Sequence, residues 1–277
     1  MSTVEILNRL HRTRFYWVIA LVSKFVYFIK GNGFVSVKYH QQYRAYEFKV
    51  SGITYMSLGP GWAYTYAYLK NLLVDTYCYF YLPKDGDCVV DIGAGLGEES
   101  LILAQLVGAY GKVLSVEANP VTYGALAYAC QVNSFTSCKP LNVALFETNT
   151  TVSIEDDAES YIGNTISNTS DKKSFQVRAV TFDTLVNENS LEKIDFLKLN
   201  IDGAEQFLLK GSDQSIGIVK NLCISCHDFR QNYHQHGEFY VTREKLRAFL
   251  VSKGFEITSR NTGNVVVDDF LYAKPKQ

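Results

Sequence analysis

Three glycines alternate directly after an apolar stretch, in the run Asp91-Ile92-Gly93-Ala94-Gly95-Leu96-Gly97. Glycine has no Cβ, so its backbone can lie against a ligand where any other residue would collide. The run Val116-Glu117-Ala118-Asn119-Pro120 places Glu117 20 residues after Gly97. A carboxylate at the end of the following strand can accept both hydroxyls of a ribose. Together the two runs predict a nucleoside-binding site.

The glycine spacing indicates which nucleoside. Dinucleotide-binding proteins usually carry G-x-G-x-x-G, whose last glycine lets a helix N-terminus approach a pyrophosphate. Here the spacing is G-x-G-x-G, with an acidic residue two positions before the first glycine. That version is typical of doubly wound methyltransferases that use S-adenosylmethionine (SAM), a cofactor without phosphate. The alternative is a tight strand-to-helix turn with no ligand, and Glu117 disfavours it.

Two further strand ends carry polar residues that could do chemistry. Ligands of open parallel sheets bind beyond the carboxyl ends of the strands, where Asn200, Asp202 and His227 are expected. Methyl transfer to a hydroxyl requires removal of a proton, and His227 and Asp202 are the candidate bases, with His227 preferred. The structural alternatives are that His227 caps a strand and that Asp202 is the N-cap of a helix beginning at Ala204.

Helices and strands must position these residues, and the sequence after residue 83 predicts where they lie. Strand-like and helix-like runs alternate there, with short linkers between them. This order predicts an α/β fold with a doubly wound, mostly parallel, seven-stranded sheet. The expected strands are 88–92, 112–117, 139–146, 194–200, 219–225, 255–259 and 265–273. The expected helices are 98–109, 120–132, 204–209 and 241–252. Extra strands at 151–154 and 175–181 flank a polar loop, which either covers a substrate site or is a solvated excursion.

Residues 1–75 differ in composition and pattern from the rest of the chain. We expect them to form an aromatic-rich N-terminal extension, with the methyltransferase domain at 76–277. Alternating segments at 34–39 and 43–50 indicate a hairpin, and 62–74 indicate a helix. Of the 19 tyrosines, 12 lie before residue 83. Tyrosines at this density could line a sugar-binding cleft, although core packing is the plainer interpretation.

An apolar segment at 15–29 holds 13 apolar residues out of 15, with only Ser23 and Lys24 interrupting it. It is short for a membrane span. Arg12, Arg14 and Lys30 flank it, as in a helix that lies on anionic lipid. The other interpretation is a helix that packs on the catalytic domain or on a second copy in a homo-oligomer.

Composition narrows the partners and the compartment. The chain has 277 residues, 20% of them charged, and a formal net charge of −1, so it lacks the basic footprint of a nucleic-acid-binding protein. We expect its six cysteines to be reduced core residues of a cytoplasmic protein, with association to a membrane as the alternative. Cys223-Ile224-Ser225-Cys226-His227 matches the pattern of covalent haem attachment. Because that segment reads as a buried strand, we expect neither haem nor a metal there.

The chain resembles the FkbM family of SAM-dependent methyltransferases. The resemblance covers roughly residues 76–260 and rests on the runs 91–97, 117–120, 142–145, 181–185 and, most specifically, 194–205. It implies SAM as the cofactor, with Asp91, Gly93, Gly95, Gly97, Glu117, Asn119, Asn142 and Ala144 at its site. Asn142 to Ala144 lie where adenine is commonly packed in such proteins.

The same resemblance places Lys198, Asp202, Gly203 and Glu205 in the motif after the fourth strand. The family motif usually reads Lys-x-Asp-x-Glu-Gly, whereas this chain has Asn200 in place of the first acid. An amide cannot accept a proton near neutral pH, so Asn200 could only orient a substrate. Glu205 could merely complement a helix dipole, and we expect Lys198 to be a buried partner of one of these carboxylates.

These residues predict an O-methyltransferase acting on a hydroxyl of a sugar, glycan or secondary metabolite. The main alternative is a catalytically inactive protein that keeps the SAM fold and docks on a membrane or glycan assembly, with Asn200 as its best support. A nicotinamide-dependent oxidoreductase is disfavoured by the glycine spacing and by the lack of a Tyr-x-x-x-Lys pair.

Overall fold

The computed structural model describes residues 15–29, 35–50, 52–59, 65–156, 174–232 and 237–276. Its central sheet has seven strands in the order β12-β13-β11-β10-β4-β5-β6, and only β13 runs antiparallel to its neighbours. The chain order reverses between β4 and β10, which is where open sheets bind ligands. The strands are β4 (Cys88–Ile92), β5 (Lys112–Val116), β6 (Cys138–Leu141), β10 (Phe196–Leu199), β11 (Leu222–Ser225), β12 (Phe255–Thr258) and β13 (Phe270–Pro275).

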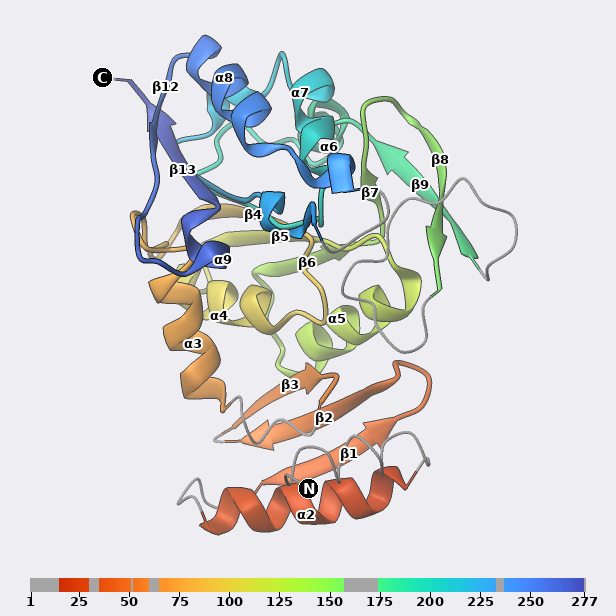
Figure 1. The fold of residues 1–277 in the computed structure, drawn as a ribbon. Coiled ribbons are helices and arrows are strands. Elements are labelled where there is room, and N and C mark those ends of the chain that lie inside the picture. The colour runs from red at the N-terminus through yellow and green to blue at the C-terminus, as the bar shows by residue number, and fades with distance from the viewer. Residues whose placement is uncertain are drawn as a thin grey trace.

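Helices cover both faces of this sheet (Figure 1), so the predicted doubly wound α/β fold is confirmed. One face packs on α3 (Tyr66–Asp75), α4 (Glu98–Val107) and α5 (Pro120–Val132). The other packs on α6 (Phe182–Glu188), α7 (Leu208–Gly211) and α8 (Arg243–Ser252). Short 3-10 turns complete the connections: η1 (Ala204–Phe207), η2 (Ile216–Ile218), η3 (Asp228–Arg230) and η4 (Gly237–Tyr240).

Two of the expected strands were wrong in their extent. The run 139–146 is split into β6 and β7 (Ala144–Leu145), which belong to different sheets. The run 265–273 begins with a helical turn, α9 (Val265–Asp268), because the Asn264 side chain accepts the N–H of Val266 and starts a helix there.

A small sheet stands beside the central one, in the order β7-β9-β8, with β8 (Thr150–Glu155) and β9 (Ser174–Val180). These are the two extra strands that the sequence predicts. The polar loop between them falls largely outside the described residues.

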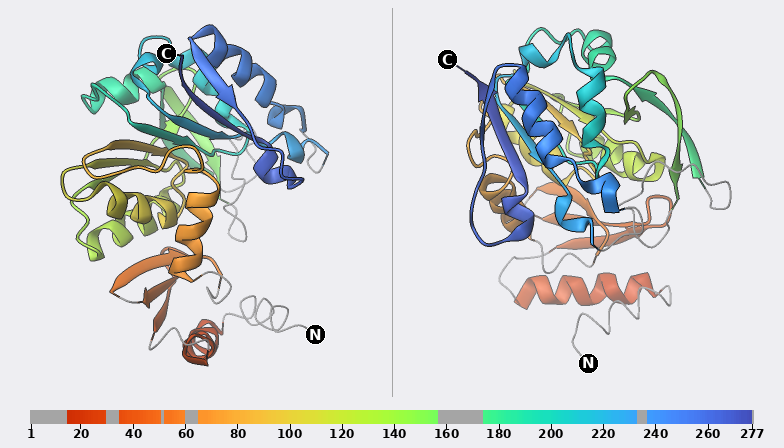
Figure 2. Two further views of the ribbon diagram at one scale, coloured as in Figure 1. Left: turned by 90° about the vertical axis from the view of Figure 1, so that its left-hand side faces the viewer. Right: turned by 45° about the horizontal axis from the view of Figure 1, so that its top comes forward.

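The N-terminal elements form two further layers below α5, clearest in the side view of Figure 2. The expected hairpin is β1 (Ser36–His40) and β2 (Ala45–Val50), and β3 (Ile53–Ser57) extends it into a sheet. On its far side lies α2 (Tyr16–Ile29), which matches the apolar segment. One apolar cluster runs from α2 through this sheet to α4 and α5. The boundary near residue 75 stays a prediction.

Polar contacts reinforce this stack. The amide N–H of Thr54 donates to Asn133 Oδ1 over 2.8 Å, and the Tyr128 hydroxyl donates to Glu47 Oε2 over 2.5 Å. Both bonds tie the three-stranded sheet to α5. Among the described residues, no helix has the length and apolarity needed to cross a bilayer.

Candidate active site

The glycine loop follows β4 and turns sharply into α4. Gly93 and Ala94 both donate their N–H to the carbonyl of Val116, which ties the loop to β5. A Cβ on Gly93 would lie 1.9 Å from the carbonyl oxygen of Asn200, so only glycine allows the two loops to approach. Gly97 packs as closely on α5, where a Cβ would meet Leu126 Cδ1 at 2.7 Å.

Gly95 differs from the other two glycines of the loop. Its φ is +57° and an added Cβ would meet no protein atom within 4 Å. Gly95 lines a cavity of about 370 Å³, so the space in front of it is available to a ligand. Close packing explains Gly93 and Gly97, whereas at Gly95 the left-handed backbone favours glycine and the space beside it is open.

A buried ion pair holds the loop from behind. Lys198 Nζ lies 2.8 Å from Asp91 Oδ1 and donates to the Gly93 carbonyl over 3.2 Å, and both charged side chains are fully buried. Asp91 also accepts the Ser100 hydroxyl over 2.6 Å. Burial alone would lower the pKa of Lys198, but the Asp91 and Glu99 carboxylates outweigh it and raise that pKa. The partner of Lys198 is therefore Asp91, not a carboxylate of the 200–205 corner as expected.

Glu117 stands at the end of β5 and faces the same cavity. Its two carboxylate oxygens accept the N–H of Asn119 over 2.8 Å and of Gly95 over 2.9 Å, so it fixes the glycine loop as well. Burial raises the pKa of Glu117 to about 7, although the N–H groups of Asn119 and Gly95 act to lower it. Asn119 caps α5 by accepting the N–H of Val121 over 2.9 Å.

Beyond Glu117 part of the cavity lining is apolar and forms an apolar slot. It is lined by Ala118, Val143, Ala144, Leu145 and Ile154. Asn142 is not among its described lining residues. The Asn142 amide instead donates to the carbonyls of Glu117 and Ala118, each over 2.9 Å, and so positions the end of β5.

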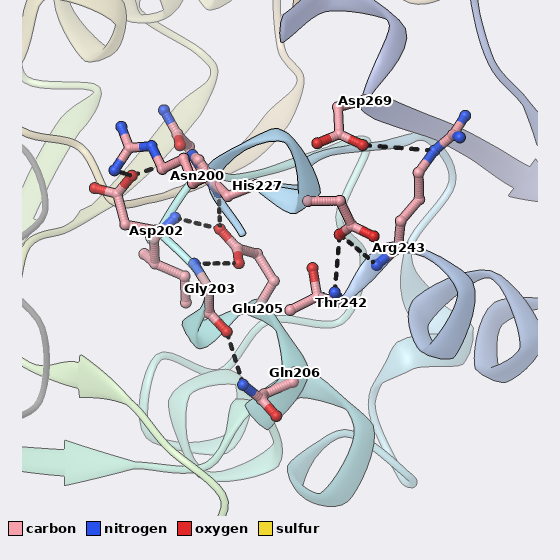
Figure 3. Close-up of polar contacts among 12 residues, drawn as sticks. Asn200, Asp202, Gly203, Glu205, Gln206, His227, Thr242, Arg243 and Asp269 are labelled. Atoms are coloured by element: carbon pink, nitrogen blue, oxygen red, sulfur yellow. Dashed lines mark hydrogen bonds and ion pairs between the residues drawn. The ribbon is translucent and has the colours of Figure 1, made fainter. Parts of the chain in front are cut away.

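The opposite end of the cavity is polar, and Figure 3 shows its residues converging from two loops. Asp202 Oδ1 lies 2.8 Å from Arg230 Nη1 and 3.1 Å from His227 Nε2. His227 Nδ1 lies 3.0 Å from Glu205 Oε1. The Glu205 carboxylate is fully buried and accepts the N–H groups of Ile201 and Gly203 over 2.8 and 2.7 Å. The corner is thus an alternating row of carboxylates and cations.

The surroundings of His227 favour its protonated form. Nε2 lies within 3.1 Å of Asp202 Oδ1 and Nδ1 within 3.0 Å of Glu205 Oε1, although Nδ1 makes no directed hydrogen bond. Burial opposes the charge, but Glu205 and Asp202 together outweigh burial and Arg230 and raise the pKa of His227 above its ordinary value. A ring whose protonated form is favoured is a poor proton acceptor, so Asp202 replaces His227 as the preferred candidate base.

Asp202 has the accessibility that His227 lacks. Its side chain is 23% exposed against 5% for His227, and its backbone is held at φ +52°. Left-handed backbone at a residue other than glycine is often found at functional sites, where the surrounding structure supports it. Gly203, rather than Asp202, takes the N-cap position of η1, and no side chain caps that turn.

Several lining residues carry no signal in the sequence. Tyr77 accepts a hydrogen bond over 2.7 Å from the Asn200 amide and stacks on Phe270, with ring centroids 5.1 Å apart. Phe229 and Phe239 add two more rings to the lining. Arg230 stands three residues after His227, yet only the fold reveals that it pairs with Asp202.

Further hydrogen bonds fix the backbone that carries Arg230. Asp228 Oδ1 accepts the N–H groups of Thr242 and Arg243 over 2.8 and 3.0 Å, where α8 begins. Asp269 accepts the N–H of Phe229 over 3.1 Å. These bonds anchor η3, which carries Arg230, against β13 and α8. Among the described residues, no three His, Cys, Asp or Glu side chains are grouped to hold a metal ion.

Comparison with known proteins identifies the family. The methyltransferase FkbM domain matches residues 91–257, more than half of the chain and the span that carries the glycine loop, Glu117 and the 198–205 motif. The chain belongs to the FkbM methyltransferase family. The matched domain is of the SAM-dependent methyltransferase type. No protein with a curated description matches the sequence.

Solved structures similar to this chain include methyltransferase FkbM from Methylobacillus flagellatus KT, with 18% identity over 70% of this chain and 45% of that one, TM-score 0.49. Fibrillarin from Aeropyrum pernix in complex with SAM has 16% identity over 86% and 98%, TM-score 0.44. The O-methyltransferase from Bacillus cereus in complex with S-adenosylhomocysteine has 14% identity over 76% and 80%, TM-score 0.42. This chain therefore spans less than half of the first of these proteins.

The residues of the cavity fit SAM. Gly95 leaves open space beside the backbone, Glu117 offers a carboxylate for two ribose hydroxyls, and the apolar slot around Ala144 suits an adenine. Asp91 and Gly97 support the loop from outside the lining, and Asn119 is part of the lining.

Proposed function

We propose that this chain is an O-methyltransferase that transfers a methyl group from SAM to a hydroxyl of a sugar, glycan or secondary metabolite. The observation that carries the proposal is Asp202, a partly exposed carboxylate at the polar end of the cofactor cavity, held by Arg230 and His227. A hydroxyl that enters this end meets a fixed proton acceptor beside the cofactor loop.

SAM, when bound, supplies an electrophilic methyl group on a sulfonium. Asp202 would take the hydroxyl proton while the acceptor oxygen joins the methyl carbon and the sulfur–carbon bond breaks, with its electron pair left on the sulfur of S-adenosylhomocysteine. A strongly basic alkoxide therefore need not form. Arg230 and the protonated His227 hold the Asp202 side chain in one orientation, which makes it ready to accept a hydrogen bond from the substrate. Glu205 is a positioning residue. It lies against His227 and accepts backbone N–H groups of the loop that carries Asp202.

The lining of the acceptor end supports a sugar-like substrate. Tyr77, Phe229, Phe239 and Phe270 contribute aromatic side chains to the lining, while Asn200 and Ser225 add polar groups. Aromatic rings with interspersed hydrogen-bonding groups suit a ligand that has both apolar faces and hydroxyls. Asn200 fits this assignment because its side-chain amide is held by a hydrogen bond to the Tyr77 hydroxyl. In that position it can orient a substrate without taking a proton.

The test is methyl transfer from isotope-labelled SAM to a panel of monosaccharides, oligosaccharides and hydroxylated metabolites, with formation of S-adenosylhomocysteine followed in parallel. The proposal predicts a labelled O-methyl ether on at least one acceptor and its loss in Asp202→Asn. Labelling on nitrogen or carbon instead would overturn the assignment to hydroxyls. SAM binding without turnover on any acceptor would favour the inactive binding protein.

A further inference from the structure

We propose that the outer face of α2 and the groove beside it dock on an anionic lipid bilayer. Trp17, Leu21, Phe25 and Ile29 recur every fourth residue and form an outer stripe along one side of the helix. Their exposed fractions are 69%, 61%, 64% and 65%. An apolar stripe this exposed along a whole helix marks an interaction surface rather than scattered surface residues.

The opposite side of α2 is fixed to the protein, so the stripe cannot turn inward. Ile19, Ser23 and Tyr27 are buried there. The Tyr27 and Tyr55 hydroxyls are 2.8 Å apart, and Tyr16 stacks on Tyr39 with ring centroids 3.7 Å apart. Figure 1 shows α2 as the outermost layer of the molecule, with the three-stranded sheet between it and the rest.

Charge decides which partner suits this face. Between Glu5 and Glu47 the chain has seven basic residues and no acidic one. Since the whole chain has 27 basic and 28 acidic residues, the remainder holds 20 basic against 28 acidic. Lys24 and Lys38 lie beside the stripe, so a second copy docked face to face would bring like charges together, whereas an anionic bilayer offers the opposite charge.

A groove beside the stripe provides a place for a lipid headgroup. It runs between α2 and β1, has a volume of about 580 Å³, and includes Lys24 and Lys38 in its lining. Ala20, Leu21 and Val37 supply apolar surface in the same groove. Ammonium groups beside apolar surface suit a phosphate with the first carbons of its acyl chains, as in interfacial helices.

The experiment is flotation of the full chain with vesicles of phosphatidylcholine alone and of phosphatidylcholine mixed with phosphatidylserine. We expect binding to the anionic vesicles only, weakened by added salt because the attraction is screened. Phe25→Asp should abolish flotation, whereas Tyr110→Asp, at a side chain that is 88% exposed elsewhere, should not. Circular dichroism of each variant shows that it is folded.

A second pair of variants separates charge at this face from net charge. Lys24→Glu with Lys38→Glu should weaken binding roughly tenfold or more. Lys220→Glu with Lys245→Glu makes the same change in net charge at two other exposed lysines and should leave binding intact. Three results would each overturn the proposal: equal binding to neutral vesicles, binding retained in Phe25→Asp, or a folded chain that stays unbound. Self-association that Phe25→Asp abolishes, without vesicle binding, would assign the face to a second copy.

Discussion

Asp202 lies between two cations, the Arg230 guanidinium and the protonated His227 ring, and this arrangement determines its part in the proposed reaction. A carboxylate held this way is a directed acceptor with little rotational freedom. The neighbouring Glu205 lies 3.0 Å from the other ring nitrogen of His227 and favours the protonated form of that ring. Proton transfer is therefore assigned to one oxygen-bearing group that faces the cavity.

Replacing Asp202 with Asn keeps the shape of the side chain and removes its ability to take a proton. We expect kcat to fall by about a hundredfold or more, the range for loss of a general base. SAM affinity should stay unchanged because Asp202 is at the other end of the cavity. Steady-state kinetics and calorimetric titration measure the two quantities. Asp213→Asn, at an exposed carboxylate, is the matched control.

The ionisation of Glu117 makes SAM binding depend on pH. Because burial raises its pKa to about 7 from an ordinary 4.5, the ligand-free protein holds a proton on Glu117 below that pH. Ribose hydroxyls need the ionised carboxylate as acceptor, so binding must release this proton. We expect SAM affinity to rise about tenfold between pH 6 and pH 8. Titrations in buffers of different ionisation enthalpy count the protons.

The Glu117→Gln variant is the control for that pH dependence. It keeps an acceptor oxygen but has no proton to lose, and any titration of SAM itself remains in both proteins. The difference between the two profiles is therefore due to Glu117. An identical pH profile in Glu117→Gln would rule out this carboxylate as the source.

At the scale of elements, the pair of Lys198 on β10 and Asp91 on β4 joins the two strands where the chain order reverses. Lys198→Met would leave the Asp91 carboxylate buried without its cation. We expect a loss of about 3–5 kcal/mol in the free energy of unfolding. Urea denaturation measures it. Lys210→Met, which removes an exposed partner of Glu147, should change stability little.

Local signals explain which elements the sequence could predict. The strand 88–92 and the helix 120–132 have the predicted bounds, because a glycine run ends the first and an Asn-Pro pair begins the second. The strand expected at 265–273 was too long because β-branched valines favour strands by propensity. The cap at Asn264 overrides that propensity. The third N-terminal strand, β3, was not predicted, although the Ser51-Gly52 pair before it is a turn signal and Gly52 has a φ of +84°.

At the scale of the whole molecule, the sequence indicates which strand ends meet, but not which side chains touch. The glycines, Glu117, Asp202 and His227 follow from motif and strand order. The partner of Lys198, the Arg230 contact and the ring of Tyr77 depend on how loops far apart in the chain pack together. The contacts of Glu205 and Asn142 with the backbone likewise appear only in the structure. Glu205 holds the loop that contains Asp202, and Asn142 holds the end of β5.

We propose that the same cavity binds the cofactor at Gly95 and Glu117 and the methyl acceptor at Asp202 and Arg230, all four of which line it. This division is the central claim, and it predicts that the two ends can be disabled separately. A change at one end should leave binding at the other intact.

Calorimetric titration of SAM into the wild type, Glu117→Ala and Asp202→Asn tests this division most directly. We expect Glu117→Ala to weaken binding by about one to two powers of ten, as for loss of a charged hydrogen-bond acceptor. Asp202→Asn should bind as the wild type does. Unchanged SAM affinity in a folded Glu117→Ala protein would contradict the account.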